Sequence, residues 1–387
     1  MSSVLGRIPG VGLAALCVGE ALGASVEAAQ PMWVAAIIKD GVFTRTQVGW
    51  LASGELLSIA IGTLAVSIAG PHAALRRTLA PAALLVAVAN AIAMLPSAWA
   101  LTTGRLLSGL GTGGVLACVI GVAARRNNAP RVLAIMQVPA MLSGSIIYFT
   151  SAFLVAQLGP SGIFAILLAL ASLEAVLARF GAPGSSAVSA QVTSGLFVSW
   201  PAALLACLAI ANVNAAFTAI WTYIVVIGAS LGFSAATIGN VLAVAAPVGM
   251  AAPVAASILG ERAGLLWPIT CSLLVMASVV FLLVRAPSQV LLGVYAAVFI
   301  MGASFYVPYA ITLLARVDRS GRLPRAAPMV FMIGGAVGPA LASRFIGRFS
   351  FEVLPVVATS IIAVGLVFFV CAAALAPRSF ARSRHHR

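Results

Sequence analysis

The chain has 387 residues, of which 62% are hydrophobic and only 8% are charged. A water-soluble protein of this length needs far more polar surface, so the composition excludes that class and predicts an all-α polytopic membrane protein. The net charge of +14 comes from arginines in short gaps between apolar runs. That distribution is typical of topology signals, and it argues against a nucleic-acid partner.

The first apolar run, 11–36, exceeds the roughly 20 residues that cross a bilayer, yet it carries Glu20 and Glu27. Helical spacing places these acids on one face together with Ala24 and Pro31. A carboxyl at membrane depth is costly unless it faces protein or water, so two of them on one face predict a proton or ion pathway. The run is too long and too acidic for a signal peptide, and we expect an uncleaved first span.

Apolar runs separated by Pro, Gly and Arg predict twelve membrane-spanning helices in total. Their approximate limits are 11–36, 47–69, 79–96, 98–124, 132–156, 161–180, 197–228, 236–260, 264–284, 288–315, 325–346 and 353–376. The Gly- and Ser-rich stretch 181–196 predicts a cytoplasmic linker between two six-helix halves. The halves would be 1–180 and 197–387, the second with a short basic tail.

An internal repeat supports this division. Phe43 and Gly49 match Phe233 and Gly239 at an offset of 190 residues, and later matches have an offset of 194. Two like halves in the same orientation form a parallel-repeat plan that is known among membrane transporters.

The basic residues of the loops predict the orientation of the chain. Sixteen of them fall in the loops on one side of the predicted spans and five in the loops on the other side. The positive-inside bias then places both termini in the cytoplasm, and we expect a bacterial inner membrane. An even number of spans requires both termini on one side, so the number of spans and the charge agree.

The five cysteines fall inside apolar runs without a CxxC pair, and the three histidines form no cluster. We therefore expect neither disulfides nor a metal site, and no cofactor. The sequence contains no GxSxG, HExxH or Walker pattern, which argues against an enzyme.

Span four carries Arg105, Gly109 and Gly111 in an arrangement that resembles the RxxxGxG motif of the major facilitator superfamily. The resemblance covers nearly the whole chain, and in that family the arginine is implicated in proton coupling. It implies a major facilitator fold that moves a small-molecule solute, together with protons, across the lipid membrane by alternating access. We expect a monomer.

A second resemblance is to the drug and sugar efflux branch of this superfamily. Thr44–Gly49 is similar to the S/T-x-x-Q-x-G stretch that opens span two in that branch. Alignment on this stretch places Glu27 at the acid of the branch, and Glu55 where the branch often has a tyrosine. Val34-Ala35 replaces the Leu-Pro pair that is typical there. The resemblance implies efflux by proton antiport.

Glu27, Glu55 and Arg105 are all expected roughly 10–14 Å below the outer surface, at about 1.5 Å per helical residue. Two carboxylates near one arginine cannot easily both stay ionised, so one is expected to bind a proton near neutral pH. A buried Glu–Arg pair that only fixes helix packing is the alternative. Glu20 is deeper and has no arginine at its level, so a second proton site, a substrate counter-charge and a packing role are all open.

Gating is predicted from two further resemblances. Gly260–Gly264 resembles the loop signature of the family, with Glu261 and Arg262 forming either a gate latch or an ordinary interfacial ion pair. Gly338-Pro339 in span eleven resembles an antiporter element that the family carries in span five.

The second half has no acid inside a predicted span, which predicts recognition of the solute by neutral groups. The candidate substrate-binding residues are Asn212, Asn214, Trp221, Tyr223, Asn240, Tyr306 and Tyr309. Helix packing is the alternative for each of them. Pro308 predicts a kink beside Tyr306. In the first half, Glu174 falls near the cytoplasmic end of span six and close to Arg179, and we expect an interfacial or interdomain ion pair there ahead of a functional role.

Together these patterns predict a proton-coupled secondary transporter that exports a small organic solute. Proton-coupled uptake and uncoupled facilitation are the alternatives within the same class. A non-transporting sensor is a further alternative, although the sequence has no soluble output domain.

Overall fold

The computed structural model describes residues 10–68, 75–123, 129–181, 199–260, 262–318, 322–349 and 351–376. The helices of the first half are α1 (Gly10–Asp40), α2 (Arg45–Ile68), α3 (Leu75–Ala93), α4 (Ala98–Ala123), α5 (Ala129–Leu158) and α6 (Ser161–Gly181). Those of the second half are α7 (Trp200–Trp221), α8 (Ile224–Ser230), α9 (Ala235–Met250), α10 (Ala252–Leu259), α11 (Leu266–Leu283), α12 (Gln289–Phe305), α13 (Val307–Val317), α14 (Arg322–Arg348) and α15 (Leu354–Leu375). A short 3₁₀ helix, η1 (Phe351–Val353), precedes α15.

The prediction of a twelve-span helical membrane protein is confirmed. Eleven segments in the described part of the chain are long and apolar enough to cross a bilayer, and α3 adds a shorter apolar stretch at Thr78–Ala93. The expected break at Pro96-Ser97 lies between the end of α3 at Ala93 and the start of α4 at Ala98.

Three spans of the second half are divided into two helices each: α7 with α8, α9 with α10, and α12 with α13. The expected kink at Pro308 is confirmed, because α12 ends at Phe305 and α13 begins at Val307. Proline has no N–H for the preceding turn, so a carbonyl is left without its helical donor. Near the α12–α13 break, a side chain from another helix bonds to a carbonyl: Ser272 Oγ donates to the Gly302 carbonyl at 2.6 Å. Tyr309 Oη, from the start of α13, donates to the Ala256 carbonyl of α10 at 3.2 Å.

The two halves repeat one another in helix spacing and in packing. α1 and α7 begin 190 residues apart, as do α2 and α9, and α6 and α15 begin 193 residues apart. α1 packs against α5 and α6, and α7 packs in the same way against α14 and α15. This regularity supports the proposed division into halves, although most of the predicted linker 181–196 lies outside the described residues.

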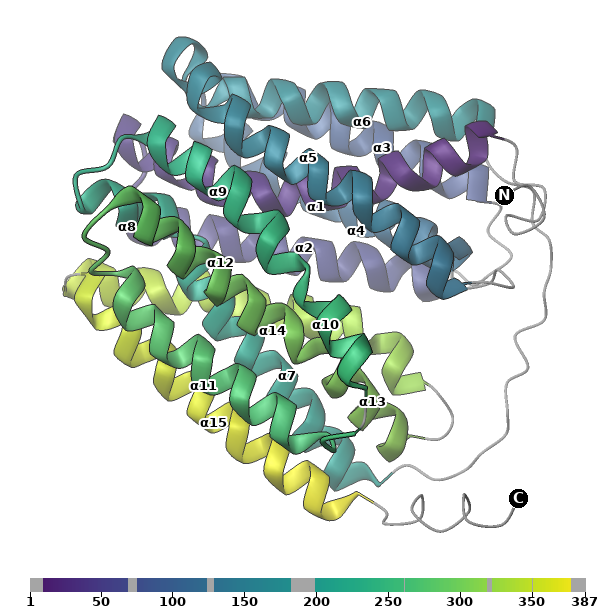
Figure 1. Cartoon of the computed structure of the whole chain (residues 1–387). Helices are drawn as coiled ribbons and strands as arrows, with labels where there is room; N and C mark the ends of the chain where they lie inside the picture. The colour runs from purple at the N-terminus through teal and green to yellow at the C-terminus, as the bar shows by residue number, and fades with distance from the viewer. Residues whose placement is uncertain are drawn as a thin grey trace.

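The two halves stack as two layers of nearly parallel helices (Figure 1). They meet where α2 packs against α14, α5 against α9 and α1 against α8. The start of α1 and the end of α15 lie at the same end of the bundle (Figure 1). We call this the terminal end, and we call the opposite end, around the α1–α2 turn at residues 41–44, the turn end.

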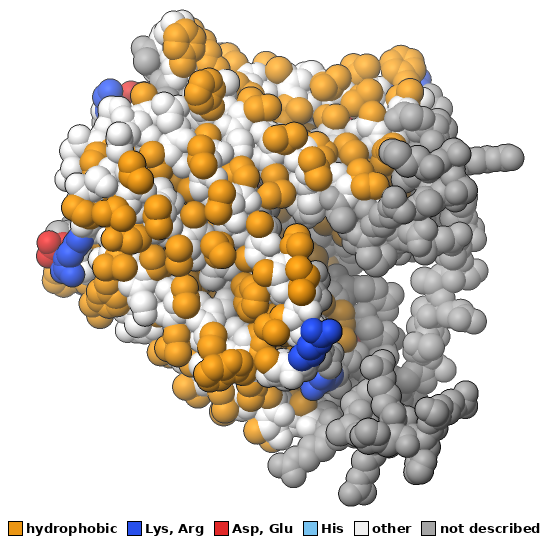
Figure 2. Space-filling view, viewed as in Figure 1, with side chains coloured by type: hydrophobic (Ala, Val, Ile, Leu, Met, Phe, Trp, Pro, Cys, Tyr) orange, Lys and Arg blue, Asp and Glu red, His pale blue; other side chains and the backbone are white. Residues whose placement is uncertain are grey.

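The outer surface is apolar over the width of the helices, as Figure 2 shows for one face. Phe149, Phe180 and Trp267 are each more than 60% exposed. Such a surface suits lipid, in which the backbone polar groups must be paired inside each helix.

Candidate functional site

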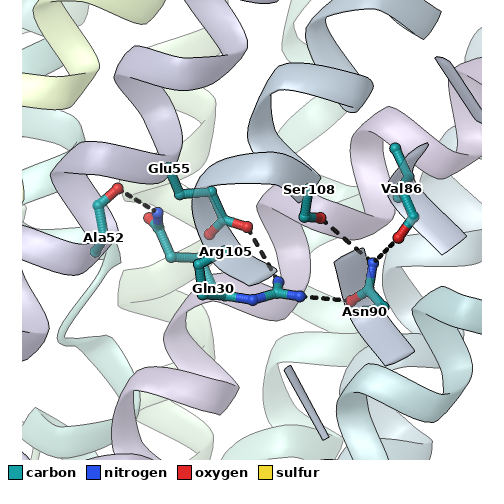
Figure 3. A network of polar contacts seen from close by, with 7 residues as sticks. All are labelled: Gln30, Ala52, Glu55, Val86, Asn90, Arg105 and Ser108. Carbon is teal, nitrogen blue, oxygen red and sulfur yellow. Dashed lines mark hydrogen bonds and ion pairs between the residues drawn. The ribbon is translucent and has the colours of Figure 1, made fainter. Parts of the chain in front are cut away.

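The inner helices of the first half hold a buried ion pair between α2 and α4. Arg105 Nη1 donates to Glu55 Oε1 at 3.1 Å, and both side chains are at most 1% exposed (Figure 3). The contact that helix depth predicted between these two residues is therefore present. Glu55 Oε2 is buried and accepts no hydrogen bond, which leaves one carboxyl oxygen free.

Two further helices complete the surroundings of Arg105. Its Nη2 donates to Asn90 Oδ1 on α3 at 2.6 Å, and the guanidinium lies 4.3 Å from the centre of the Phe164 ring on α6. Asn90 in turn donates to the Val86 carbonyl at 2.8 Å and to Ser108 Oγ at 3.3 Å. The charge of Arg105 is thus shared among a carboxylate, an amide and a ring face, which are favourable partners in a low dielectric.

The glycines of the RxxxGxG stretch explain how α2 and α4 come close enough for this pair. A Cβ atom at Gly109 would collide with the backbone carbonyl of Glu55, and one at Gly113 with that of Ile59. Small residues let two membrane helices approach at backbone distance. The separation of Glu55 and Arg105 is therefore fixed by backbone contact.

A second polar group joins the two halves. Gln30 on α1 donates from Nε2 to the Ala52 carbonyl of α2 at 3.3 Å, and its Oε1 accepts from Thr222 Oγ1 at 3.0 Å. Thr222 lies at the break between α7 and α8, and both side chains are buried. Ala52 is one turn before Glu55, so Gln30 links the ion-paired helix to the opposite half.

The other cross-half contacts gather toward the turn end. Tyr223 Oη donates to the Arg45 carbonyl at 3.3 Å, and the Ala340 N–H donates to Ser53 Oγ at 2.9 Å. Arg45 also lies over the Phe351 ring at 5.3 Å. The described residues thus close the interface between the halves at this end.

Glu27 lies at the boundary between the halves, less than one turn before Gln30. Its side chain is partly exposed, and it makes no hydrogen bond or ion pair with any described residue. Its charged neighbours are Glu20 and Glu55, both acids. Pro31 has no N–H to donate to the Glu27 carbonyl, so this backbone oxygen also lacks its helical partner.

Partial exposure follows one face of α1 from the terminal end and stops at Glu27. Cys17, Glu20, Ala24 and Glu27 are partly exposed, whereas every residue from 28 to 34 is buried. The helical spacing that predicted a common face for Glu20 and Glu27 thus agrees with the partial exposure of both side chains. We call these four residues the α1 stripe.

Glu20 and Glu174 are two further acids in the helices of the first half. Glu20 Oε1 accepts from Gln137 Nε2 on α5 at 3.5 Å. Glu174 on α6 is fully buried and neither of its oxygens has a hydrogen-bond partner. The expected ion pair with Arg179 is not formed, because Arg179 is exposed on another face of the same helix.

The neutral candidates of the second half are distributed over several places. Trp221 is buried at the boundary, edge-on to Tyr148 of α5 at 6.1 Å and stacked on Phe217 at 5.7 Å. Asn212 is partly exposed and bonds within its own helix, to the Leu208 carbonyl. Tyr223 belongs to the closed turn end described above.

The other four neutral candidates lie away from this boundary or are engaged in packing. Asn214 donates to the Phe331 carbonyl of α14 within the same half, and Asn240 is exposed. Tyr306 is buried against the rings of Phe331 and Phe369. Tyr309 bonds to α10 beside the helix break.

The predicted gating element of span eleven lies where α14 packs on α7. A Cβ atom at Gly338 would collide with Thr218 and with the Ala215 carbonyl. Pro339 cannot donate to the Gly335 carbonyl, and Thr218 Oγ1 donates to that carbonyl instead, at 2.7 Å. In the loop signature, Glu261 lies outside the described residues, and Arg262 is exposed.

The sequence interpretation missed three residues of the site: Asn90, Tyr148 and Phe164. Asn90 had a visible signal, since it is a lone amide in an apolar run and such groups need a buried partner. Tyr148 and Phe164 had none, because an aromatic residue in a membrane span is ordinary.

Two repeated halves of six spans each, the first of which holds a buried ion pair, define a helical membrane protein of the two-domain carrier type. A sequence model of the Major Facilitator Superfamily matches residues 10–326, and the chain belongs to this superfamily. It is therefore a multi-pass membrane transporter. No curated protein sequence matches the chain.

Solved structures of three transporters are similar in fold. A D-xylose–proton symporter is 12% identical with a TM-score of 0.74, covering 94% of this chain and 97% of the symporter. A nucleoside transporter is 12% identical with a TM-score of 0.75, covering 93% and 99% of the two chains. A peptide transporter is 12% identical with a TM-score of 0.70, covering 94% and 95%.

Proposed function

We propose that this transporter exports a small organic solute in exchange for protons, and that Glu27 is the carboxyl at which the two compete. The observation that carries the proposal is the position of Glu27. It is a partly exposed acid at the boundary between the halves, with no cation among its described neighbours. A carboxyl of this kind is costly in a membrane unless a proton or a solute compensates its charge.

Glu55 and Arg105 serve this site indirectly. The Arg105 guanidinium is already paired with Glu55 and Asn90, so it is not available to a solute carboxylate. Glu55 is an electrostatic neighbour of Glu27, and its free Oε2 can accept a proton when Glu27 changes its charge. This arrangement favours a neutral or positively charged solute over an anion.

Alternating access follows from the distribution of the cross-half contacts. The loop charges favour a cytoplasmic terminal end, and with that orientation the contacts at the turn end close this conformation toward the outside. The α1 stripe then gives Glu27 access from the cytoplasm. Rocking of the halves breaks the contacts at the turn end and exposes the same carboxyl to the other side.

Trp221 and Asn212 are the second-half residues that we assign to the solute site. Trp221 offers an apolar ring at the depth of Glu27, because Gln30 and Thr222 join the two helices there. Asn212 offers a partly exposed amide on α7. We assign Tyr306 and Tyr309 to the helix break and Tyr223 to the closed end, and we propose that Gly338 and Pro339 act through the packing of α14 on α7.

The test uses purified protein in proteoliposomes with an imposed pH gradient. The probes are D-xylose, a nucleoside, a dipeptide and tetraphenylphosphonium, which represent the solutes that the similar transporters are named for and one organic cation. We expect flux of at least one neutral or cationic probe against the proton flow. Glu27→Gln should abolish gradient-driven flux but retain exchange of labelled for unlabelled probe, and Arg179→Gln is the matched control.

Normal gradient-driven flux in Glu27→Gln would contradict the assignment of this residue. The direction is tested in the same vesicles. If the probe accumulates on the side toward which protons move, the protein is an uptake symporter, and if the pH gradient has no effect on flux it is a facilitator.

A further inference from the structure

Glu174 is a buried carboxyl that the proposed transport cycle does not use. It lies on α6 with its side chain fully buried, while its neighbours Leu173 and Val176 are about half exposed on the lipid side. Its carboxyl points toward α1, because a Cβ atom at Gly19 would lie 3.0 Å from Glu174 Oε1. The same spot on α1 faces Val115 and Val119 of α4, so the carboxyl lies among three helices.

Among the described residues, no positive charge compensates this carboxyl. Neither oxygen has a hydrogen-bond partner. The described titratable groups that interact with it are Cys17 from α1 and Cys118 from α4. The described side chains of α3 and α5, which also pack on α6, include no charged residue. Removing an ion from water without a partner costs several kcal/mol, so a carboxyl in these surroundings holds its proton.

Glu174 is connected to the α1 stripe through Gly19. The Glu174 carboxyl lies against Gly19, and Glu20 follows Gly19 in the chain and is partly exposed on the stripe. One oxygen of Glu20 is buried and unpaired. Cys17 of the stripe interacts electrostatically with both acids. The buried acid is therefore next to the part of α1 that carries a partly exposed one.

We propose that Glu174 is a second proton-binding site, which is loaded in the conformation closed at the turn end and exchanges its proton through Glu20. In the exchange, the Glu174 O–H bond breaks and the proton passes to the Glu20 carboxylate or to water beside it. The Glu174 carboxylate that remains has no compensating charge. Release of its proton therefore accompanies a movement of α1 away from α4 and α6, which admits water. The role in transport rests on the proposed function, whereas binding of the proton does not.

A purely structural role for Glu174 makes a different prediction. A carboxyl that only fills space would keep its proton at every accessible pH and would exchange it only on unfolding. A proton-binding site exchanges in the folded protein, and a neighbouring carboxyl changes the rate. The two roles are separated by following the proton itself.

The experiment is infrared spectroscopy of the full-length protein in lipid nanodiscs, with the proton and deuteron as probes. Wild type should show a protonated-carboxyl stretching band at neutral pH that Glu174→Gln removes. After transfer to deuterium oxide, this band should shift in wild type while the amide bands of the helices remain protected. Glu20→Gln should keep the band and slow its shift by about tenfold or more.

Two results would overturn the proposal. One is a neutral-pH spectrum in which Glu174→Gln removes no protonated-carboxyl band. The other, which needs no folded Glu174→Gln protein, is an unchanged rate of shift in Glu20→Gln. Failure of the transport proposal would look different: wild-type vesicles would show no response to a pH gradient while the infrared band of Glu174 behaved as described.

Discussion

The two halves of this transporter share one helix plan but differ in how they satisfy polar groups inside the membrane. The helices of the first half contain Glu20, Glu27, Glu55 and Glu174, together with Arg105, and they are continuous. In the second half, the α-helices contain no acidic residue, the short helix η1 contains Glu352 at the start of the last span, and three spans are broken. The polar groups inside the first half are therefore mainly charged side chains. Those inside the second half are mainly backbone carbonyls that have lost their helical donor.

The difference shows how a repeated fold divides two tasks. A buried ion pair such as Glu55–Arg105 depends strongly on both partners, and it changes when a proton arrives. A carbonyl capped by a hydroxyl, such as Gly335 by Thr218, is insensitive to pH. The response to protons that we propose would thus be confined to the first half, and the second half supplies a surface of broken helices without acidic side chains.

The largest effect is expected from breaking the ion pair in the first half. Arg105→Leu leaves the Glu55 carboxylate buried without a partner, which should destabilise the protein by about 3–5 kcal/mol. Thermal unfolding of the detergent-solubilised protein measures the loss. The double variant Arg105→Leu with Glu55→Leu removes both charges and should recover most of the stability.

The contrast between the two halves requires that the double variant recovers this stability. If the double variant is as unstable as Arg105→Leu, the charge of Glu55 is not what the arginine compensates. Transport should be lost in both variants, because neither keeps the pair that faces Glu27.

The stability of the second half should instead fall when a hydroxyl that caps a carbonyl is removed. Thr218→Val removes the donor to the Gly335 carbonyl, which Pro339 leaves unpaired, at a cost of about 1–3 kcal/mol. Pro339→Ala restores a backbone N–H for that carbonyl. We therefore expect Thr218→Val to be nearly harmless in the Pro339→Ala background. Equal losses of unfolding temperature in both backgrounds would show that the hydroxyl does not cap this carbonyl.

The smallest effect is expected where the halves meet. Thr222→Val removes one hydrogen bond to Gln30, worth about 0.5–1.5 kcal/mol, without leaving a charge buried. It should leave thermal stability nearly unchanged and shift the conformational equilibrium toward opening at the turn end. Labelling of a cysteine placed at Thr46 should become faster by about 2- to 10-fold. Ser360→Ala, an exposed hydroxyl change on α15, is the matched control and should leave the labelling rate unchanged.

The sequence predicted the fold well because hydrophobic length and helix breakers act locally. Twelve spans, the break after Ala93 and the kink at Pro308 were all visible as runs and prolines. The break between α7 and α8 was not predicted, since Thr222 and Tyr223 include no proline or glycine. That break is set by contacts with Gln30 and Arg45 of the other half, which no local pattern encodes.

The candidate site was predictable only where depth along a helix decides which residues meet. Depth placed Glu55 beside Arg105, and the structure has them in contact. The depth of a residue along its helix does not say in which direction its side chain faces. Depth therefore could not show that Glu27 lies outside the Glu55–Arg105 pair. The expected pairing of Glu174 with Arg179 also failed for this reason, because five residues along a helix turn a side chain to another face.

The polar contacts at the turn end have a consequence for the energetics of the cycle. Three hydrogen bonds join the described halves there, and each is worth about 0.5–1.5 kcal/mol. One proton moving down a gradient of one pH unit releases about 1.4 kcal/mol. The work of parting these groups is therefore of the same order as the work that a few protons deliver. A carrier balanced in this way runs forward or backward according to the concentrations on its two sides, and reversing the gradients reverses the transport.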